Sequence, residues 1–315
     1  MTEPPTDTKS AATLENHHHQ AQNPSSALTT LWQTLARFKQ AQQPAFATAG
    51  TLLGLERTGS LLPNDKDIDI GIDWLHMNDA VNLLQQNGWQ EWQRSYDLIN
   101  PRCFKNADGL VVDLCGYATE QTTQTVVSGL WMDKVPFEWN RITVFPAITL
   151  TQRNSPAGRV WHLKQPQTFL NALYGEDWST PDPTFDTIVC AHNLRRFSWL
   201  AQCYAYSRLY QHLKQRRYAK ALSQTRCIRR HRPEDPLLQQ LQKQLETLTS
   251  QKADRVLALG YFDLIHIGHL NYLNYAKQQG QTLVVGVAPD AFSQQSKGYS
   301  PVLPESQRLK MVAAL

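Results

Sequence analysis

Residues 63–71 read Pro-Asn-Asp-Lys-Asp-Ile-Asp-Ile-Gly and decide the fold expected for the first half of the chain. Successive strand residues point to opposite faces of a sheet, so Asp67 and Asp69 share one face. Ile68 and Ile70 then share the other face, which belongs in the core. Paired carboxylates repel one another unless a proton or an oxygen-preferring divalent cation lies between them, and we predict Mg²⁺. The alternative is a solvated strand edge with incidental acids.

A turn of small residues lies upstream of this strand, in 49–57, Ala-Gly-Thr-Leu-Leu-Gly-Leu-Glu-Arg. A glycine-bracketed turn at the start of a short helix lets the backbone amides of Gly50 and Thr51 approach a phosphate closely. Arg57 is predicted to add a charge-assisted contact to that phosphate. A third acid, Asp113, follows in the strand-like run Leu-Val-Val-Asp-Leu. The sequence therefore predicts a phosphate turn, paired acids and a third acid on the next strand.

This order of motifs resembles the nucleotidyltransferase superfold and, more closely, the LicD-type phosphotransferases, the choline-phosphate transferase family that also includes the fukutin-related proteins. The resemblance covers 31–183 and is carried by Gly50-Thr51-Leu52-Leu53-Gly54, Arg57, Gly59, Pro63, Asp65, Asp67–Gly71, Tyr174–Trp178 and Pro181. It implies that Asp67, Asp69 and Asp113 hold Mg²⁺ on the diphosphate of a CDP-alcohol, whose alcohol phosphate passes to a glycan acceptor. The family commonly shows an aromatic and an acid where this chain has Asn64 and Lys66.

The run 256–260, Val-Leu-Ala-Leu-Gly, predicts a buried strand, and 282–287 predicts a second one after an intervening helix. This βαβ pattern brings the first strand end and the helix start together, where a triphosphate binds. His266 and His269 stand three apart at the helix start, so both imidazoles face one side. With the helix dipole, they are expected to stabilise the charge on a phosphate under in-line attack.

The string 260–269, Gly-Tyr-Phe-Asp-Leu-Ile-His-Ile-Gly-His, closely resembles the His-x-Gly-His signature of the cytidylyltransferase family. The resemblance implies that both histidines contact the nucleotide phosphates and that three further residues shape the pocket: Gly260, Phe262 and Asp263. It makes Lys297 a candidate for binding the phosphate of the incoming substrate, with Arg308 a weaker one. The similarity covers 254–315 without the family's later Arg-Thr-x-Gly-Ile-Ser-Thr-like motif, so we expect a partial domain.

These features predict a multidomain α/β and α+β chain: a mixed-sheet nucleotidyltransferase fold, a helical segment, and a partial Rossmann-like βαβ unit. The expected divisions are a polar disordered leader at 1–27, a LicD-like domain at 28–185, a basic helical segment at 186–252 and a partial cytidylyltransferase-like domain at 253–315. The chain shows no signal-peptide pattern and no apolar run long enough to span a bilayer. With 5 cysteines and no Cys-x-x-Cys pair, we expect reduced thiols and a cytoplasmic protein.

Acidic residues are absent between Thr187 and Pro233, whereas Arg and Lys recur through 195–232 with tyrosines between them. We expect a solvated basic face packed on its neighbours. An anionic membrane surface is the alternative partner, which would place the protein at the periphery of the inner membrane surface. Nucleic acid is not an expected partner.

Together, the two resemblances imply a bifunctional transferase of phosphorus-containing groups, of the EC 2.7 class. One half would make a CDP-alcohol from CTP and an alcohol phosphate, and the other would use it in cell-surface glycan synthesis. The alternative is a non-catalytic scaffold, in which the nucleotide domain is vestigial and the basic helices recruit an acidic polymer or a membrane.

Overall fold

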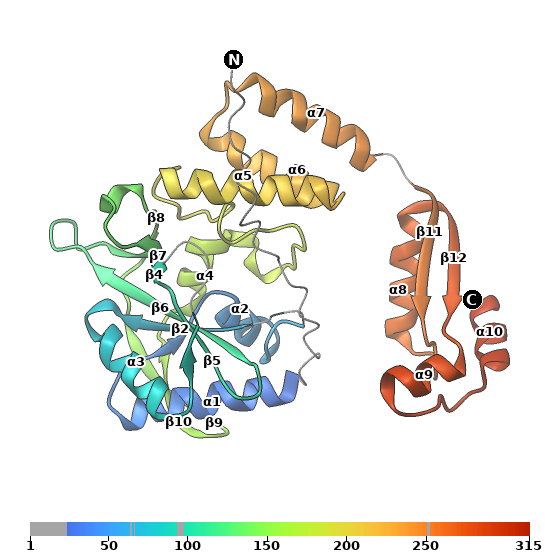
Figure 1. Ribbon diagram of the computed structural model, residues 1–315, viewed down its shortest axis with the longest axis horizontal. Helices are drawn as coiled ribbons and strands as arrows, with labels where there is room; N and C mark the ends of the chain where they lie inside the picture. The colour runs from blue at the N-terminus through green and yellow to red at the C-terminus, as the bar shows by residue number, and fades with distance from the viewer. Residues whose placement is uncertain (1–23, 64, 66, 93–97, 251–252) are drawn as a thin grey trace, which may run out of the picture. The chain divides into compact units, whose positions relative to one another are not determined.

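The computed structural model describes residues 24–63, 65, 67–92, 98–250 and 253–315 (Figure 1). The chain separates into two compact units, Met1–Gln211 and His212–Leu315. Most of the predicted leader, 1–23, lies outside the described residues. The first helix begins at Pro24, inside the range 1–27 that was predicted as a leader.

The first unit combines one large sheet, a separate β-hairpin and several helices. Its helices are α1 (Pro24–Gln40), α2 (Ala49–Thr58), η1 (Trp74–His76), α3 (Met77–Gln86), η2 (Phe137–Trp139), α4 (Pro166–Tyr174) and η3 (Glu176–Ser179), and α5 (Trp199–Lys214) begins in it. Its strands are β1 (Phe46–Ala47), β2 (Asp67–Asp73), β3 (Gln90–Glu91), β4 (Leu98–Asn100), β5 (Arg102–Lys105), β6 (Val111–Thr119), β7 (Val126–Met132), β8 (Arg141–Phe145), β9 (Leu150–Ser155) and β10 (Gly158–Leu163).

The sheet is mixed, as predicted. Among the described residues it has 8 strands, ordered β1-β2-β6-β5-β3, with β7 pairing β6, β4 and β8. Strands β2 and β6 run parallel, and their register sets Asp69 directly beside Asp113. Because partners in a sheet share a face, this register brings the third predicted acid to the paired acids.

The two faces of β2 differ as the alternation predicts. Ile68 and Ile70 are 1% and 0% exposed and pack with Leu31 and Leu35 of α1. The acids take the other face, where α2 packs. A Cβ at Gly54 of α2 would lie 2.5 Å from the Ser60 carbonyl oxygen, so glycine is what lets the helix pack closely on the segment leading into β2.

A histidine is held neutral where the β9–β10 hairpin meets α2. His162 Nε2 lies 3.3 Å from Glu56 Oε1. Burial, with a smaller contribution from Arg153, lowers the pKa of His162 from 6.5 to about 4. Between these values the unfolded chain binds a proton that the folded chain does not, so stability falls as the pH drops through this window. Burial raises the pKa of Glu56, which offsets part of that loss because the folded carboxyl takes up a proton.

We expect the His162→Gln variant to lose less stability on acidification than the wild type, by up to about 3 kcal/mol between neutral pH and pH about 4. Urea unfolding at a series of pH values measures this difference. His76→Gln, a change at an exposed histidine of η1, serves as the control and should keep the wild-type slope. Equal slopes in the wild type and His162→Gln would contradict the prediction.

The second unit contains a helical hairpin and a βαβ unit, as predicted. Its elements are α6 (Tyr218–His231), α7 (Pro236–Ser250), β11 (Ala253–Gly260), α8 (Ile267–Gln278), β12 (Gly280–Val287), α9 (Asp290–Lys297) and α10 (Glu305–Ala313). Strands β11 and β12 pair in parallel, which fits a crossover through α8. Their inward faces form a small core with Leu273 and Ala276 of α8.

The cysteines differ in part from the expectation of five reduced thiols. Cys103, Cys115 and Cys203 are free thiols, as predicted. Cys190 and Cys227 are disulfide-bonded, so the prediction was wrong for these two. Sequence spacing missed them because disulfide formation depends on Cα separation in space, which linear spacing does not encode. No helix in the described part of the chain has the length and apolar character needed to cross a bilayer.

Candidate functional sites

The carboxylate of Asp69 lies at the N-terminus of α2. Its Oδ2 accepts hydrogen bonds from the backbone N–H groups of Gly50, at 3.0 Å, and Thr51, at 3.4 Å. The Thr51 hydroxyl in turn accepts a bond from the Asp69 N–H at 2.8 Å. The first amides of a helix lack intrahelical partners and carry the positive end of the dipole, so they bind an anion. The amides predicted to bind phosphate therefore hold Asp69 in this structure.

Asp65 belongs to the same cluster, although we predicted no role for it in the site. A Cβ at position 50 would lie 2.9 Å from Asp65 Oδ2 and 3.3 Å from Asp69 Oδ2. Only glycine fits between these oxygen atoms and α2. The available signal was the spacing Asp-x-Asp-x-Asp, which continues the alternation of the strand by one further residue.

The carboxylates repel one another. Burial raises the pKa of Asp69 well above its usual range, and the charges of Asp67, Asp113 and Asp65 raise it further. The bond from the Thr51 amide acts in the opposite direction. Bringing a cation to this cluster would relieve the repulsion.

The donor set fits Mg²⁺ by its chemistry. Hard divalent cations prefer carboxylate oxygens, and Mg²⁺ commonly takes one or two protein carboxylates together with substrate phosphates. Oxygens of both Asp65 and Asp113 are buried in the cluster. Within the described ranges, no three His, Cys, Asp or Glu side chains converge as a preformed metal site. The assignment of Mg²⁺ to Asp67, Asp69 and Asp113 therefore stays a prediction.

Arg57 is engaged with the loop that follows α4. Its Nε donates to the Trp178 carbonyl at 2.6 Å, and its Nη2 donates to the carbonyls of Trp178 and Thr180. Burial lowers the pKa of this guanidinium. Arg57 thus links α2 to the loop that follows α4. The predicted contact of Arg57 with a phosphate stays a prediction.

Tyr174, the last residue of α4, is a second residue near the acids for which we predicted no role in the site. Burial raises the pKa of the phenol, and the charges of Asp69 and Asp65 raise it further, so the hydroxyl keeps its proton. A side-chain hydrogen bond with Thr187 orients it. The ring stands at the C-terminus of α4, next to Gly175, whose φ of 92° turns the chain into the loop held by Arg57.

The second candidate site is a cavity of about 520 Å³ at the carboxyl end of β11. Its lining includes the five residues predicted at this strand end and helix start: Gly260, Phe262, Asp263, His266 and His269. Four residues that were not predicted complete the lining: Leu259, Tyr261, Leu264 and Tyr272. A Cβ at Gly260 would lie 2.8 Å from the Phe262 ring, so glycine lets this buried ring fold back under the cavity. Phe262 itself adopts a positive φ of 50°.

The hydrogen bonds at the start of α8 assign the tautomer of both histidines. His266 caps the helix, and its Nδ1 accepts a bond from the Gly268 N–H at 3.1 Å. His269 Nδ1 accepts from the His266 N–H at 3.4 Å, and the two rings stack with centroids 4.0 Å apart. Burial, then the charge of His266, lowers the pKa of His269. Because Nδ1 acts as the acceptor in both rings, Nε2 carries the proton and is left as a donor for an anionic ligand.

Glycine at position 268 is required by this cap. A Cβ there would lie 2.9 Å from the His266 ring, inside van der Waals contact. The His-x-Gly-His spacing thus encodes a helix cap and two neighbouring donors at once.

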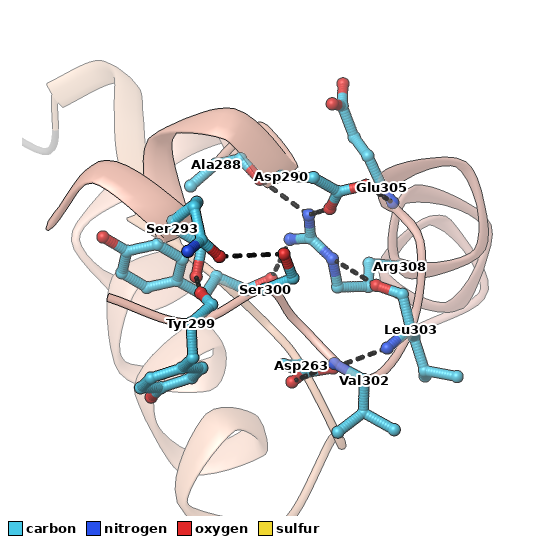
Figure 2. A network of polar contacts seen from close by, with 12 residues as sticks. Asp263, Ala288, Asp290, Ser293, Tyr299, Ser300, Val302, Leu303, Glu305 and Arg308 are labelled. Atoms are coloured by element: carbon cyan, nitrogen blue, oxygen red, sulfur yellow. Dashed lines mark hydrogen bonds and ion pairs between the residues drawn. The ribbon is translucent and has the colours of Figure 1, made fainter. Parts of the chain in front are cut away.

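Arg308 is buried and bonds to the protein's own backbone. The sequence had made it a weaker candidate for binding the phosphate of the incoming substrate. The side chain is 0% exposed and donates to the carbonyl of Tyr261. It also donates to the carbonyls of Ala288 and Leu303 and to the Asp290 carboxylate (Figure 2). It thereby links the ends of both parallel strands to α10.

Asp263 bonds to the segment before α10, which Arg308 also contacts through the Leu303 carbonyl. Its carboxylate accepts the backbone N–H groups of Val302 at 2.8 Å and Leu303 at 3.0 Å, and these bonds lower its pKa (Figure 2). Lys297 ends α9, and its side chain lies outside the described part, so its phosphate role stays a prediction.

The mixed sheet with its acid cluster and the βαβ unit with its histidine pair are consistent with nucleotidyltransferase-like folds. Residues 42–156 match the family model described as LicD/FKTN/FKRP, nucleotidyltransferase domain. Residues 257–315 match the family model described as cytidylyltransferase-like. The chain thus carries an N-terminal LicD-type domain and a C-terminal cytidylyltransferase-like domain, as predicted.

A similar curated protein is the FAD synthase of Thermoplasma acidophilum, 46% identical over 61 residues. That match covers 19% of this chain and 42% of the relative, so the chain spans less than half the length of that relative. Among solved structures, a lincomycin-bound lincosamide antibiotic adenylyltransferase, LnuA, shares 13% identity over 49% of this chain and 92% of its own, with a TM-score of 0.33. ANT(2″)-Ia, in complex with adenylyl-2″-tobramycin, shares 10% identity over 71% of this chain and 98% of its own, with a TM-score of 0.32.

Proposed function

We propose that the chain catalyses two linked reactions: cytidylyl transfer from CTP to an alcohol phosphate, and transfer of that alcohol phosphate from the CDP-alcohol to a glycan. The observation that carries the proposal is the acid cluster around the Asp69 carboxylate at the N-terminus of α2. Neighbouring carboxylates can bind a divalent cation, and the backbone amides at a helix N-terminus can bind a phosphate. Together they suit a diphosphate that carries a bound metal ion. The match to FAD synthase supports a nucleotide substrate in the second domain.

In the transfer to the glycan, Asp67, Asp69 and Asp113 would hold Mg²⁺, which when bound neutralises charge on the donor diphosphate. The acceptor hydroxyl oxygen attacks the phosphorus that bears the alcohol, the bond from that phosphorus to the CMP oxygen breaks, and CMP leaves. One of the carboxylates takes the proton of the hydroxyl. For the amides of Gly50 and Thr51 to bind phosphate, Asp69 must release them, so donor binding exchanges one anion for another at this helix terminus.

In the cytidylyl transfer, an oxygen of the alcohol phosphate attacks the α-phosphorus of CTP, and pyrophosphate leaves. The Nε2–H groups of His266 and His269 donate to the triphosphate, where charge builds up in the transition state. Gly260, Phe262 and Asp263 shape the cavity that takes the nucleotide. Lys297 meets the phosphate of the incoming substrate.

Calorimetry with CTP and Mg²⁺ tests the second site. We expect the wild type to bind CTP and His269→Ala to bind it at least about tenfold more weakly, because a hydrogen bond to a charged group is lost. His231→Ala, the same change at an exposed histidine of α6, should leave the affinity unaltered. Unchanged CTP affinity in His269→Ala would end this part of the proposal.

Titration with CDP-glycerol, CDP-ribitol and CDP-choline tests the first site independently. We expect one of these donors to bind in the presence of Mg²⁺ and Asp67→Ala to abolish that binding, because the metal and its bound diphosphate lose a ligand. Chelation of Mg²⁺ should have the same effect on the wild type. Binding that survives both changes would contradict the proposed metal site.

The basic stretch 195–232 underlies the alternative of a scaffold recruited to an anionic membrane. Several of its arginines are paired with acids: Arg195 with Glu120, Arg196 with Glu138, Arg208 with Asp186 and Arg226 with Glu246. These pairs reduce the positive field that the sequence implies. Salt-sensitive binding to anionic vesicles without turnover would favour the scaffold over the transferase.

A further inference from the structure

Two tryptophan side chains lie half-exposed beside one another on the first unit. Trp139 ends η2 and Trp199 begins α5, and they are 50% and 51% exposed. Their ring centroids lie 6.0 Å apart, with the planes inclined at 37°. A pair of large exposed rings marks a binding surface more often than isolated apolar side chains do.

The backbone and its polar contacts hold this pair in place. The Arg195 N–H donates to the Ile142 carbonyl of β8 at 2.9 Å, which anchors the segment before α5. Arg196 Nη2 donates to the Glu138 carbonyl at 2.6 Å, next to Trp139. The two rings are therefore presented by fixed elements, which lowers the entropic cost of binding.

The charges around the pair cancel. Arg195 pairs with Glu120 at 2.8 Å, and Arg196 pairs with Glu138 at 2.6 Å. A rim with two guanidinium groups and two carboxylates has no net charge, so it does not favour a polyanion or an anionic membrane. It does supply both donors and acceptors beside an apolar floor, as small-ligand sites do.

We propose that Trp139 and Trp199 form a platform for a neutral sugar chain. The C–H groups on the flat face of a pyranose carry small positive charge, which the negative face of an indole attracts. The hydroxyl groups at the edge of the sugar meet Glu138 as acceptor and Arg196 as donor. Two rings inclined to each other follow the bend between neighbouring sugar units.

The platform deepens the proposed function, and its link to the glycan acceptor rests on that function. Trp74, which follows β2, contacts Trp131 at 5.0 Å between centroids, and Trp131 contacts Phe137 of η2 at 5.6 Å. This aromatic row joins η2 to the end of β2 opposite Asp67. The strand spans about 20 Å, because each residue rises about 3.3 Å. The platform and the acid cluster therefore belong to connected elements of the first unit.

Binding is measured without catalysis, by calorimetry with neutral hexaoses of glucose, galactose, mannose and N-acetylglucosamine. We expect at least one hexaose to bind, and Trp139→Ala and Trp199→Ala each to weaken it at least about tenfold. Trp139→Phe keeps an aromatic face and should retain most of the affinity. Trp92→Ala removes a tryptophan of similar exposure, 49%, outside the platform and should change nothing. Thermal unfolding of each variant confirms that it is folded.

Several outcomes overturn the platform: no hexaose binds, binding survives both alanine changes, or the alanine variants instead lose affinity for anionic vesicles. If the platform binds sugar while no CDP-alcohol is used by the wild type, the platform stands and the proposed transferase fails. If transfer occurs and no hexaose binds, the transferase stands and the platform fails.

Discussion

The Asp69→Asn variant is expected to transfer alcohol phosphate about a thousandfold more slowly than the wild type. Asparagine keeps an oxygen that accepts the amides of Gly50 and Thr51, so the helix cap survives. It removes the charge that holds Mg²⁺ on the donor, an interaction that contributes several kcal/mol to the transition state. The rate of CMP release from the best-binding CDP-alcohol, with saturating acceptor, measures the effect.

Asp73→Asn is the matched control, because it makes the same chemical change at the exposed far end of the same strand. Its rate should stay within about a factor of two of the wild type, since surface changes rarely alter more than a few tenths of a kcal/mol. Thermal unfolding separates catalysis from structure: the unfolding temperature of Asp69→Asn should not fall. A variant that folds normally and transfers at the wild-type rate would remove Asp69 from the proposed mechanism.

The Arg308→Ala variant is expected to unfold the second unit at markedly lower temperature. Alanine leaves the carbonyls of Tyr261, Ala288 and Leu303 without their common donor in a buried position. Each hydrogen bond to a charged group contributes about 1.5–3 kcal/mol, so the combined loss is at least about 3 kcal/mol. Hydrogen exchange of the β11 and β12 amides, followed by mass spectrometry, measures the local stability.

Lys310→Ala is the control for this change, since Lys310 is an exposed cation of the same helix. It should leave exchange in β11 and β12 unaltered. Arg308→Lys keeps the charge, yet a single ammonium group cannot reach all the partners of a guanidinium group. The stability of Arg308→Lys should therefore lie between that of the wild type and that of Arg308→Ala. Wild-type protection in Arg308→Ala would show that the network contributes little.

Local pattern predicted much of the fold and of both sites. The alternation in 67–70 predicted which side of β2 enters the core, because side-chain direction in a strand follows from its period of two. The apolar runs before and after the histidine motif predicted the parallel βαβ unit, because short buried strands flanking a helix have few other arrangements. Asp113 beside Asp69 followed from placing the third acid on the next strand.

Pairings across long sequence separations did not follow from pattern. The backbone carbonyls that Arg57 and Arg308 bond to were not predicted from the sequence. An arginine bonds whichever acceptors surround it, and those acceptors come from loops 47 and 121 residues away in sequence. Pattern within one segment holds no information about them.

The sequence by itself determined the alternation of β2, the helix cap built into His-x-Gly-His, and the two families of domain. Each of these depends on residues within a few positions of one another, where covalent geometry fixes the side-chain directions. Only the tertiary structure decided that Asp65 and Tyr174 join the acids, that Asp69 holds the α2 amides, and that two tryptophans far apart in sequence meet. These contacts depend on how distant segments pack, since packing sets distances that the order of residues leaves open.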